Sequence, residues 1–204
     1  MFKKLLLSFV LIIGALLSIA LIRTLMHSAP EPTVNVGLTA DIDGEAATNN
    51  LAASIRFKTI SHQDKEKFSP QEFEGFIKWA ADTYPEFHSA MQLEMLEYTL
   101  LFKWEGSDNS LAPILLTAHY DVVPVIPGTE SIWEEEPFAG VISNNRIWGR
   151  GALDDKSGVV GMMEAATYLI QNNFQPTRTV YFSFGHDEEI GGGGAAQVTE
   201  KLKQ

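Results

Sequence analysis

The order of apolar and polar positions divides the chain into a long apolar stretch, a polar segment and a region of mixed patterns. Leu5–Ile22 contains no charged residue; Lys3 and Lys4 precede it and Arg23 follows it. About 18 apolar residues are roughly the minimum that crosses a bilayer as a helix, whereas the apolar core of a cleaved signal is usually about 7–15 residues long. We therefore predict an uncleaved membrane anchor over residues 1–26, with a cleaved signal peptide as the alternative.

The charges beside this stretch predict its orientation. Two lysines before it and one arginine after it favour an N-terminus in the cytoplasm, so the rest of the chain would be periplasmic, extracellular or lumenal. A signal peptide would instead give a secreted protein. Residues 27–50 contain Pro30, Pro32 and Gly37 among several acids, a composition typical of a linker. Residues 51–204 are then the globular part.

Within the globular part the patterns alternate between strand and helix. The apolar run 113–118 is typical of a buried strand of a mixed or parallel sheet, and 177–184, rich in Val, Tyr and Phe, predicts a second strand. Apolar positions from Val159 to Ile170 keep a period of 3.6 residues, which predicts a helix, and a last helix is expected over 195–202. The fold class predicted is α/β: a three-layer sandwich in which helices cover both faces of a central mixed sheet.

Three local patterns add detail. The run 96–104 alternates as a single strand would. Ser69, Pro70 and Glu72 predict a helix start with a capping box. The segment 140–148 predicts a hairpin that turns at Asn144 and Asn145.

Composition and charge restrict the chemistry. The 204 residues are 45% hydrophobic and 20% charged, which suits one or two domains with a core. The formal net charge of −11 argues against a nucleic-acid partner. The chain has no cysteine, so a metal site here must use His, Asp and Glu.

Ligand-type side chains gather at three places along the globular part. His119 and Asp121 follow the first strand; taken alone, they resemble a partly buried histidine beside a turn. Asp154 and Asp155 stand among glycines before a helix, where acids also favour the positive helix end. The glycine spacing fits neither a phosphate loop nor a dinucleotide fingerprint, and acids suit a cation better.

The third cluster, 186–189, follows the second strand and reads His-Asp-Glu-Glu; a solvated loop is its alternative reading. Four glycines, 191–194, follow and let the backbone curl tightly around a site. Each interval between clusters is long enough for a strand, loop and helix unit. We expect the three clusters to meet at one edge of the sheet, with His119 and Glu189 less than about 10 Å apart if they share a metal site.

Together the three clusters resemble the N-terminal signatures of the di-zinc exopeptidases, which include carboxypeptidase S, glutamate carboxypeptidase, the zinc aminoacylases and succinyl-diaminopimelate desuccinylase. The motifs are His119-x-Asp121, Gly149-Arg-Gly-x-x-Asp154-Asp-Lys156 and His186-Asp-Glu188-Glu189. Val122-Val-Pro, Trp133 and Pro137-Phe-x-Gly140 are most similar to the carboxypeptidase S and N-fatty-acyl-amino-acid hydrolase branch. The resemblance covers about residues 50–204.

The resemblance implies a role for each motif residue. His119 would bind one of two zinc ions, for which cobalt is a substitute, and Asp121 would orient His119. Asp154 would bridge both metals, with a cis peptide bond after it. Glu188 would be the general base and Glu189 a ligand of the second zinc. Two further ligands, an Asp and a His, and a lid domain through which the family dimerises are expected after Gln204, so the chain is expected to be the N-terminal part of a longer enzyme.

Two classes of function follow. The first is a zinc-dependent hydrolase that cleaves an amide beside a free carboxylate, in a peptide or an N-acyl amino acid. The second is a membrane-tethered, catalytically inactive relative that binds a metal or a protein partner. With three direct ligands for two metals, the chain as it stands is expected to bind zinc weakly and to hydrolyse nothing.

Overall fold

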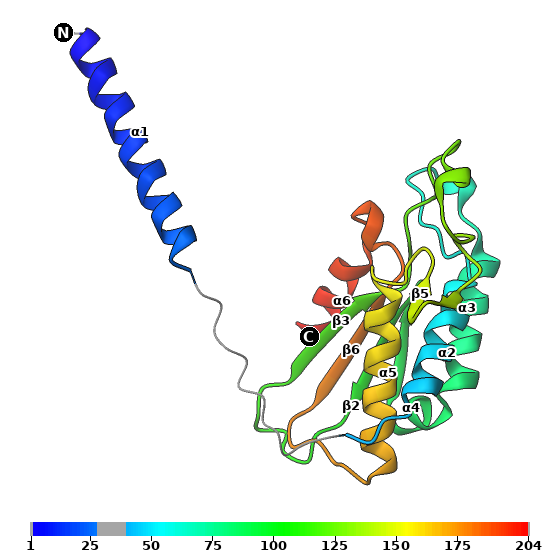
Figure 1. Cartoon of the computed structure of the whole chain (residues 1–204). Coiled ribbons are helices and arrows are strands. Elements are labelled where there is room, and N and C mark those ends of the chain that lie inside the picture. The colour runs from blue at the N-terminus through cyan, green and yellow to red at the C-terminus, as the bar shows by residue number, and fades with distance from the viewer. Residues whose placement is uncertain (1, 28–39, 204) are drawn as a thin grey trace. The chain divides into compact units, whose positions relative to one another are not determined.

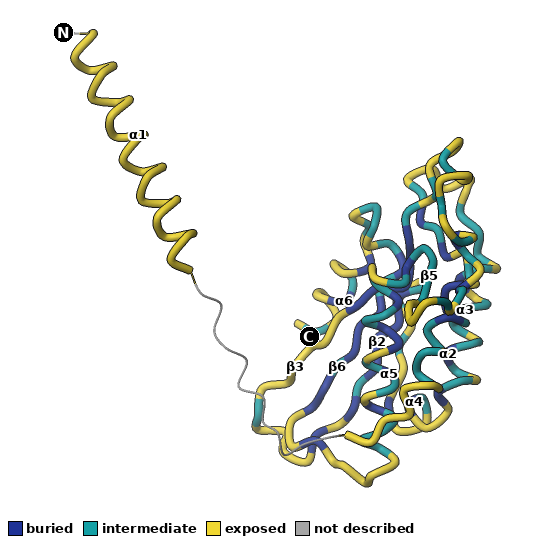
Figure 2. The backbone as a smooth tube through the Cα atoms, in the orientation of Figure 1, coloured by how far each residue is buried: buried dark blue, intermediate teal, exposed yellow. Residues whose placement is uncertain are grey.

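The computed structural model describes residues 2–27 and 40–203, and it separates the chain into two compact units, residues 1–40 and 41–204. The first unit contains α1 (Phe2–Leu25), whose residues are all exposed (Figures 1 and 2). Among the described residues it is the one helix long and apolar enough to cross a membrane, a property that signal sequences share. Residues 28–39 of the predicted linker lie outside the described residues.

The second unit is built on a four-stranded mixed sheet in the order β1-β2-β6-β3. Its strands are β1 (Gln92–Leu96), β2 (Thr99–Trp104), β6 (Val180–Gly185) and β3 (Ile114–His119). The pair β3 and β6 is parallel, and the other neighbours are antiparallel. Helices lie on both sides of this sheet, as the sequence predicted. They are α2 (Gly44–Ile55), α3 (Pro70–Thr83), α4 (Pro85–Ala90), α5 (Lys156–Gln171) and α6 (Gly194–Leu202), with single 3₁₀ turns at η1 (Lys65–Lys67), η2 (Glu130–Ile132) and η3 (Glu188–Ile190) (Figure 1).

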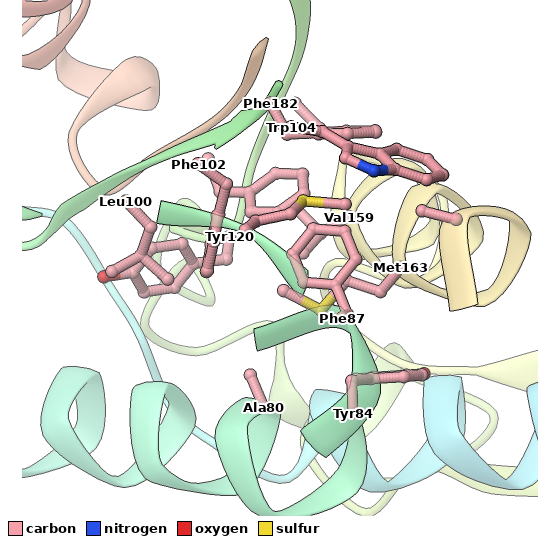
Figure 3. Close-up of a cluster of buried hydrophobic side chains, with 14 of the residues drawn as sticks. Ala80, Tyr84, Phe87, Leu100, Phe102, Trp104, Tyr120, Val159, Met163 and Phe182 are labelled. Atoms are coloured by element: carbon pink, nitrogen blue, oxygen red, sulfur yellow. The ribbon is translucent and has the colours of Figure 1, made fainter. Parts of the chain in front are cut away.

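The core lies between the sheet and the helices α3, α4 and α5, and it is rich in aromatic rings (Figure 3). Phe87 of α4 meets Phe102 of β2 at 4.8 Å and Phe182 of β6 at 5.4 Å between ring centroids. Tyr120, directly after β3, stacks on Phe76 of α3 with 4.4 Å between the centroids. Each fully buried ring contributes about 1.5–3 kcal/mol through burial, so this packing holds the end of β3 firmly in place.

Helix α2 begins earlier than predicted, so the predicted linker over residues 27–50 was wrong for its last seven positions. The cause is Asp43, whose Oδ1 accepts hydrogen bonds from the backbone N–H groups of Glu45 (3.1 Å) and Ala46 (2.9 Å). This N-cap satisfies two of the free donors of the first turn, and it allows a helix in a segment whose composition indicates a loop.

The single strand predicted over 96–104 is confirmed from Thr99 onwards but was wrong at its start, because β1 and β2 form a hairpin there. Glu97 adopts a φ of 56°, and the chain reverses at this point so that Leu96 pairs with Thr99. Glutamate carries no sequence signal for a left-handed turn, so the alternating pattern concealed it. The hairpin predicted over 140–148 is confirmed: β4 (Val141–Ser143) and β5 (Arg146–Trp148) turn at Asn144 and Asn145, both with positive φ.

The start of α3 is correct, but its capping box was wrong. Among the described residues, Ser69 caps the helix without a side-chain hydrogen bond. Glu72 instead accepts a hydrogen bond from the backbone N–H of Lys58 at 2.8 Å. The carboxylate of Glu72 therefore binds a backbone group outside its own helix and not the N-cap residue Ser69.

Strand β3 is less buried than its apolar sequence predicted. Within the described sheet it pairs with β6 alone, and Ile114, Leu115 and Leu116 are 40%, 42% and 39% exposed (Figure 2). Only its last two residues, Ala118 and His119, are buried. Among the described residues β3 is thus an edge strand of the sheet, and its buried part is its C-terminal end.

Candidate metal centre

His119, the last residue of β3, is placed by the pairing of two parallel strands. It lies opposite Gly185, the last residue of β6, so the loop that carries residues 186–189 begins directly beside it. The carboxyl ends of neighbouring parallel strands meet at one edge of a sheet, where ligands bind in open α/β folds. His119 is 8% exposed, and its ring faces this edge.

Three candidate ligands come together there. One ligand atom each of His119, Asp154 and Glu189 lies within 4.8 Å of the other two. The Nε2 atom of His119 lies 3.0 Å from Oδ1 of Asp154 and 3.7 Å from Oε2 of Glu188. The ligand atoms of His119 and Glu189 are therefore well within the expected distance of about 10 Å. One imidazole and two carboxylates are a donor set that suits a divalent ion such as zinc.

Asp154 reaches the cluster from a turn before a helix, whereas His119 and residues 186–189 follow the ends of strands. The segment from Gly149 to Asp155 lies between β5, which belongs to the separate two-stranded sheet, and the start of α5. Asp155 caps α5 by accepting a hydrogen bond from the N–H of Gly158 at 3.1 Å. The peptide bond between Asp154 and Asp155 is cis, as the resemblance implied. The two adjacent acids thus have different contacts: Asp155 caps α5, and Asp154 faces the cluster.

Asp121 holds the centre together. It is fully buried, and its Oδ1 lies 3.2 Å from Nδ1 of His119. The same carboxylate accepts hydrogen bonds from the backbone N–H groups of Glu188 (3.2 Å) and Glu189 (3.1 Å). A carboxylate accepts only, so Nδ1 of His119 donates its proton to Asp121, and Nε2 faces Asp154, where it can bind a metal once its own proton is lost. One side chain therefore orients the histidine and positions both glutamates.

Ser61 completes this arrangement, and sequence reasoning missed it. Its hydroxyl donates to Oδ2 of Asp121 at 2.6 Å, and both residues are buried. Ser61 is held there by its neighbour Ile60, which forms a β-bridge with Val122 after β3. Because this contact joins segments about 60 positions apart, no local pattern signals it.

The hydrogen-bond network shifts the protonation of its members. Burial disfavours a charged ring, but the hydrogen bonds and charge of Asp121, with a contribution from Asp154, raise the pKa of His119 to about 9. Burial alone would raise the pKa of Asp121, yet the hydrogen bonds from His119, Ser61 and Glu189 lower it. Partial burial and the neighbouring acids, Asp154 first, raise the pKa of Glu189. The protonated ring of His119 therefore offsets part of the negative charge of the neighbouring carboxylates, and a bound cation would have the same effect.

Lys156 fixes the turn that carries Asp154. The side chain is fully buried, and Nζ donates hydrogen bonds to the carbonyl groups of Ser54 (2.9 Å) and Phe57 (2.6 Å) at the end of α2. Burial lowers the pKa of Lys156 to about 7. Lys156, the lysine of the second motif, thus links the end of α2 to the turn that carries Asp154 through hydrogen bonds.

The first two residues of the 186–189 cluster face away from the candidate ligands. Nδ1 of His186 lies 2.7 Å from the hydroxyl of Thr99. The carboxylate of Asp187 accepts hydrogen bonds from the N–H of Gly194 and so caps α6. Only Glu188 and Glu189 lie at the centre, which means that half of this apparent acidic cluster is structural.

Comparison with known proteins identifies the family. Residues 115–204 match peptidase family M20/M25/M40. Residues 115–204 therefore belong to the M20 peptidases. The chain is 37% identical over 195 residues to a probable carboxypeptidase S-like protein of Dictyostelium discoideum, an alignment that covers 91% of this chain and 37% of that protein. It is 38% identical over 157 residues to the N-fatty-acyl-amino acid synthase/hydrolase PM20D1 of Xenopus tropicalis, covering 75% of this chain and 30% of the relative.

The fold agrees with this assignment. The structure matches human carnosine dipeptidase 1 with a TM-score of 0.62 at 22% identity, over 78% of this chain and 35% of that structure. The M20 family is metal-dependent, and the relatives of this chain include carboxypeptidase S-like proteins. The chain thus spans about a third of the length of the proteins it matches, and that third contains all three motifs.

Proposed function

We propose that the protein is a zinc-dependent hydrolase that cleaves an amide bond beside a free carboxylate, in an N-acyl amino acid or a peptide. The observation that supports this most directly is the convergence of His119, Asp154 and Glu189 within 4.8 Å, on motifs shared with M20 enzymes. Carboxypeptidase S-like proteins and N-fatty-acyl-amino acid hydrolases among the relatives indicate the class of substrate.

Within this proposal each residue has a distinct task. His119, Asp154 and Glu189 would hold the metal, with Asp154 shared between two zinc ions. Zinc supplies Lewis acidity, which makes water acidic enough to react near neutral pH and polarises an amide carbonyl. Glu188 is not a proposed ligand, and its Oε2 lies 3.7 Å from Nε2 of His119, so its carboxylate lies at the centre. It would accept the proton of the attacking water and return it to the leaving nitrogen.

Substitution of Glu188 by Gln tests this assignment. In the full-length protein, Glu188→Gln should retain the zinc content but reduce kcat by about 10²–10⁴, because the amide cannot accept the proton. Glu200→Gln, an exposed change on α6, is the matched control and should leave both unchanged. Zinc content is measured by elemental analysis and turnover on N-acyl amino acids and dipeptides.

The same experiment addresses the alternative of an inactive relative that binds a metal or a partner. Near-normal turnover of zinc-loaded Glu188→Gln protein would contradict the role of Glu188. Metal binding by the unsubstituted protein with no turnover of either substrate class would favour the inactive relative.

We further propose that α1 is an uncleaved anchor with its N-terminus in the cytoplasm, so that the second unit lies outside the cytoplasm. Support comes from its length of 24 residues, from its exposed apolar surface and from Lys3 and Lys4 ahead of the apolar run.

A further inference from the structure

A pocket lies beside the loop 186–189, where His186 and Asp187 face away from the candidate ligands. Its volume is about 450 Å³, within the range of small-molecule sites. Three segments enclose it: residues 61–68, the turn between β1 and β2, and residues 186–193. None of the three candidate metal ligands lines it, so this pocket, which we name the hairpin pocket, is distinct from the candidate metal centre.

His186 gives the hairpin pocket a buried hydrogen-bond donor. It lines the pocket, is 6% exposed, and its Nδ1 lies 2.7 Å from the hydroxyl of Thr99. That hydroxyl is fully buried, and among the described residues this ring nitrogen is its one hydrogen-bond partner. A buried hydroxyl needs an acceptor, so Thr99 donates to Nδ1 and the ring proton is on Nε2. Oε2 of Glu97 lies 3.8 Å from Nε2, which is too far for a hydrogen bond, so this donor is free for a ligand.

The opposite side of the hairpin pocket suits a positive charge. Glu97 lines it, and its Oε1 lies 3.4 Å from Nε2 of Gln197, which donates to it. The rings of Phe68 and Tyr98, with 5.2 Å between their centroids, provide an aromatic wall. An ammonium group binds favourably to a carboxylate and to the face of an aromatic ring. The pocket therefore has an acceptor for a cation close to a donor for an anion.

This combination defines the class of ligand. A simple anion would be repelled by Glu97, and a simple cation would leave the N–H of His186 without an acceptor. An α-amino acid carries its carboxylate and its ammonium on one carbon atom, so both charges can reach groups that lie 3.8 Å apart. We propose that the hairpin pocket binds a free α-amino acid with a large apolar side chain. Its carboxylate contacts Nε2 of His186 and the ammonium of Lys65, its ammonium contacts Glu97, and its side chain lies against the aromatic wall.

The walls of the hairpin pocket also support the candidate metal centre. Ser61 lines the pocket, and its hydroxyl donates to Asp121, which orients His119. Asp187 lines it as well and directly precedes Glu188. A ligand that holds both walls restrains the groups that position the centre, so the amino acid and zinc should each tighten the binding of the other. This coupling rests on the proposed function, whereas binding of the amino acid does not.

Calorimetric titration of the metal-free, full-length protein tests the ligand. L-phenylalanine should bind at least about tenfold more tightly than L-phenylalaninamide, which lacks the carboxylate, or 3-phenylpropanoate, which lacks the ammonium. The reason is that each analogue loses one charge-assisted hydrogen bond. Equal affinity for the three compounds, or no binding of phenylalanine, would overturn the hairpin pocket as an amino-acid site.

Exposed residues of the hairpin pocket have matched controls outside it. Glu97→Gln and Lys65→Ala should each weaken phenylalanine binding about two- to fivefold, the range for exposed charge pairs, and the double variant about tenfold. Glu86→Gln, on the exposed surface of α4, and Lys67→Ala, in the same 3₁₀ turn as Lys65, should leave it unchanged. Equal losses in the variants and their controls would place the amino acid elsewhere and overturn the assignment.

Zinc titration measures the coupling. With a coupling of about fivefold, phenylalanine at three times its dissociation constant should tighten zinc binding about fourfold in the wild type and less than twofold in the double variant. An equal effect in both proteins would mean that the amino acid acts at the metal, and the coupling would be wrong.

The hairpin pocket and the proposed hydrolase fail separately in this design. Selective binding of phenylalanine by a protein that turns over neither N-acyl amino acids nor peptides would uphold the pocket and contradict the proposed function. Turnover by a protein that does not bind phenylalanine in its metal-free form would uphold the hydrolase and overturn the pocket.

Discussion

At the scale of single residues, the buried Asp121 is the organising group of the candidate metal centre, because four hydrogen bonds converge on its carboxylate. Two come from backbone N–H groups of the glutamate loop, one from His119 and one from Ser61. A buried carboxylate needs such donors, since each unmet acceptor in an apolar surrounding is costly.

Removal of the Ser61 hydroxyl should therefore loosen the centre without removing a ligand. Ser61→Ala should lower the free energy of unfolding by about 1.5–3 kcal/mol, the usual worth of a hydrogen bond to a charged group, and weaken zinc binding about tenfold or more. Ser61→Thr, which keeps the hydroxyl, should restore most of the affinity. Calorimetric titration with zinc and urea unfolding provide the two readouts.

Ser54→Ala is the matched control for this change. Its hydroxyl is also buried but donates to the carbonyl of Leu51 at 2.7 Å, away from Asp121. The control should lose about 0.5–1.5 kcal/mol of stability and keep its zinc affinity. If the two alanine variants lost zinc affinity equally, the hydroxyl of Ser61 would have no specific role.

The raised pKa of His119 predicts how metal uptake depends on pH. Below its pKa of about 9 the ring is protonated in the metal-free protein, so a metal must displace that proton. Zinc affinity should thus rise about tenfold per pH unit up to about pH 9, with about one proton released per zinc at pH 7.5. Calorimetry in two buffers of different ionisation enthalpy counts the proton.

Asp121→Asn distinguishes the cause of this effect. It removes the negative charge that raises the pKa of His119, so burial should dominate and proton release at pH 7.5 should decrease. Unchanged release in this variant would show that the proton comes from another group.

At the scale of elements, the glycine run 191–194 is shaped by Asp187 rather than by the metal centre. A Cβ at Gly192 would lie 2.0 Å from Oδ2 of Asp187, and one at Gly194 would lie 2.6 Å from its Oδ1. The backbone approaches closely because the Asp187 carboxylate caps α6 from the preceding loop. The glycines thus allow η3 and α6 to follow each other within a few residues.

This arrangement predicts opposite outcomes for neighbouring glycines. Gly192→Ala should displace the Asp187 cap and destabilise the protein by about 1–3 kcal/mol, the range for an overpacked site. Gly193→Ala should be tolerated, since the nearest atom to its Cβ is Nε2 of Gln197 at 3.8 Å. Urea unfolding midpoints compare the two. Equal midpoints would mean that the loop adjusts without breaking the cap.

At the scale of the whole molecule, the chain consists of a membrane-type helix and a unit that carries the peptidase motifs. If α1 is an anchor, the chain should remain with membranes after alkaline carbonate extraction, and its N-terminal sequence should begin near residue 1. Release from membranes with a new N-terminus after about residue 26 would identify α1 as a cleaved signal. The result decides whether the candidate metal centre is held at a membrane or lies in solution.

The sequence by itself determined the fold class, the main strands and helices and the three motifs. These depend on local periodicity and on short patterns, such as the strand ending at His119 and the turn at Asn144 and Asn145, where neighbours along the chain decide the outcome. The resemblance of the motifs to those of the di-zinc exopeptidases is also read directly from the chain, and it agrees with the match of residues 115–204 to the M20 peptidases.

Tertiary structure alone decided which polar groups serve the centre and which serve the scaffold. Asp154 and Asp155 are identical neighbours, yet one faces His119 and the other caps α5. Asp187 caps α6 while Glu188 and Glu189 lie at the centre, and Ser61 joins it from far away in the chain. The exposure of β3 likewise depends on which strands pair with it. Each outcome is set by contacts between distant segments, whose geometry no local pattern contains.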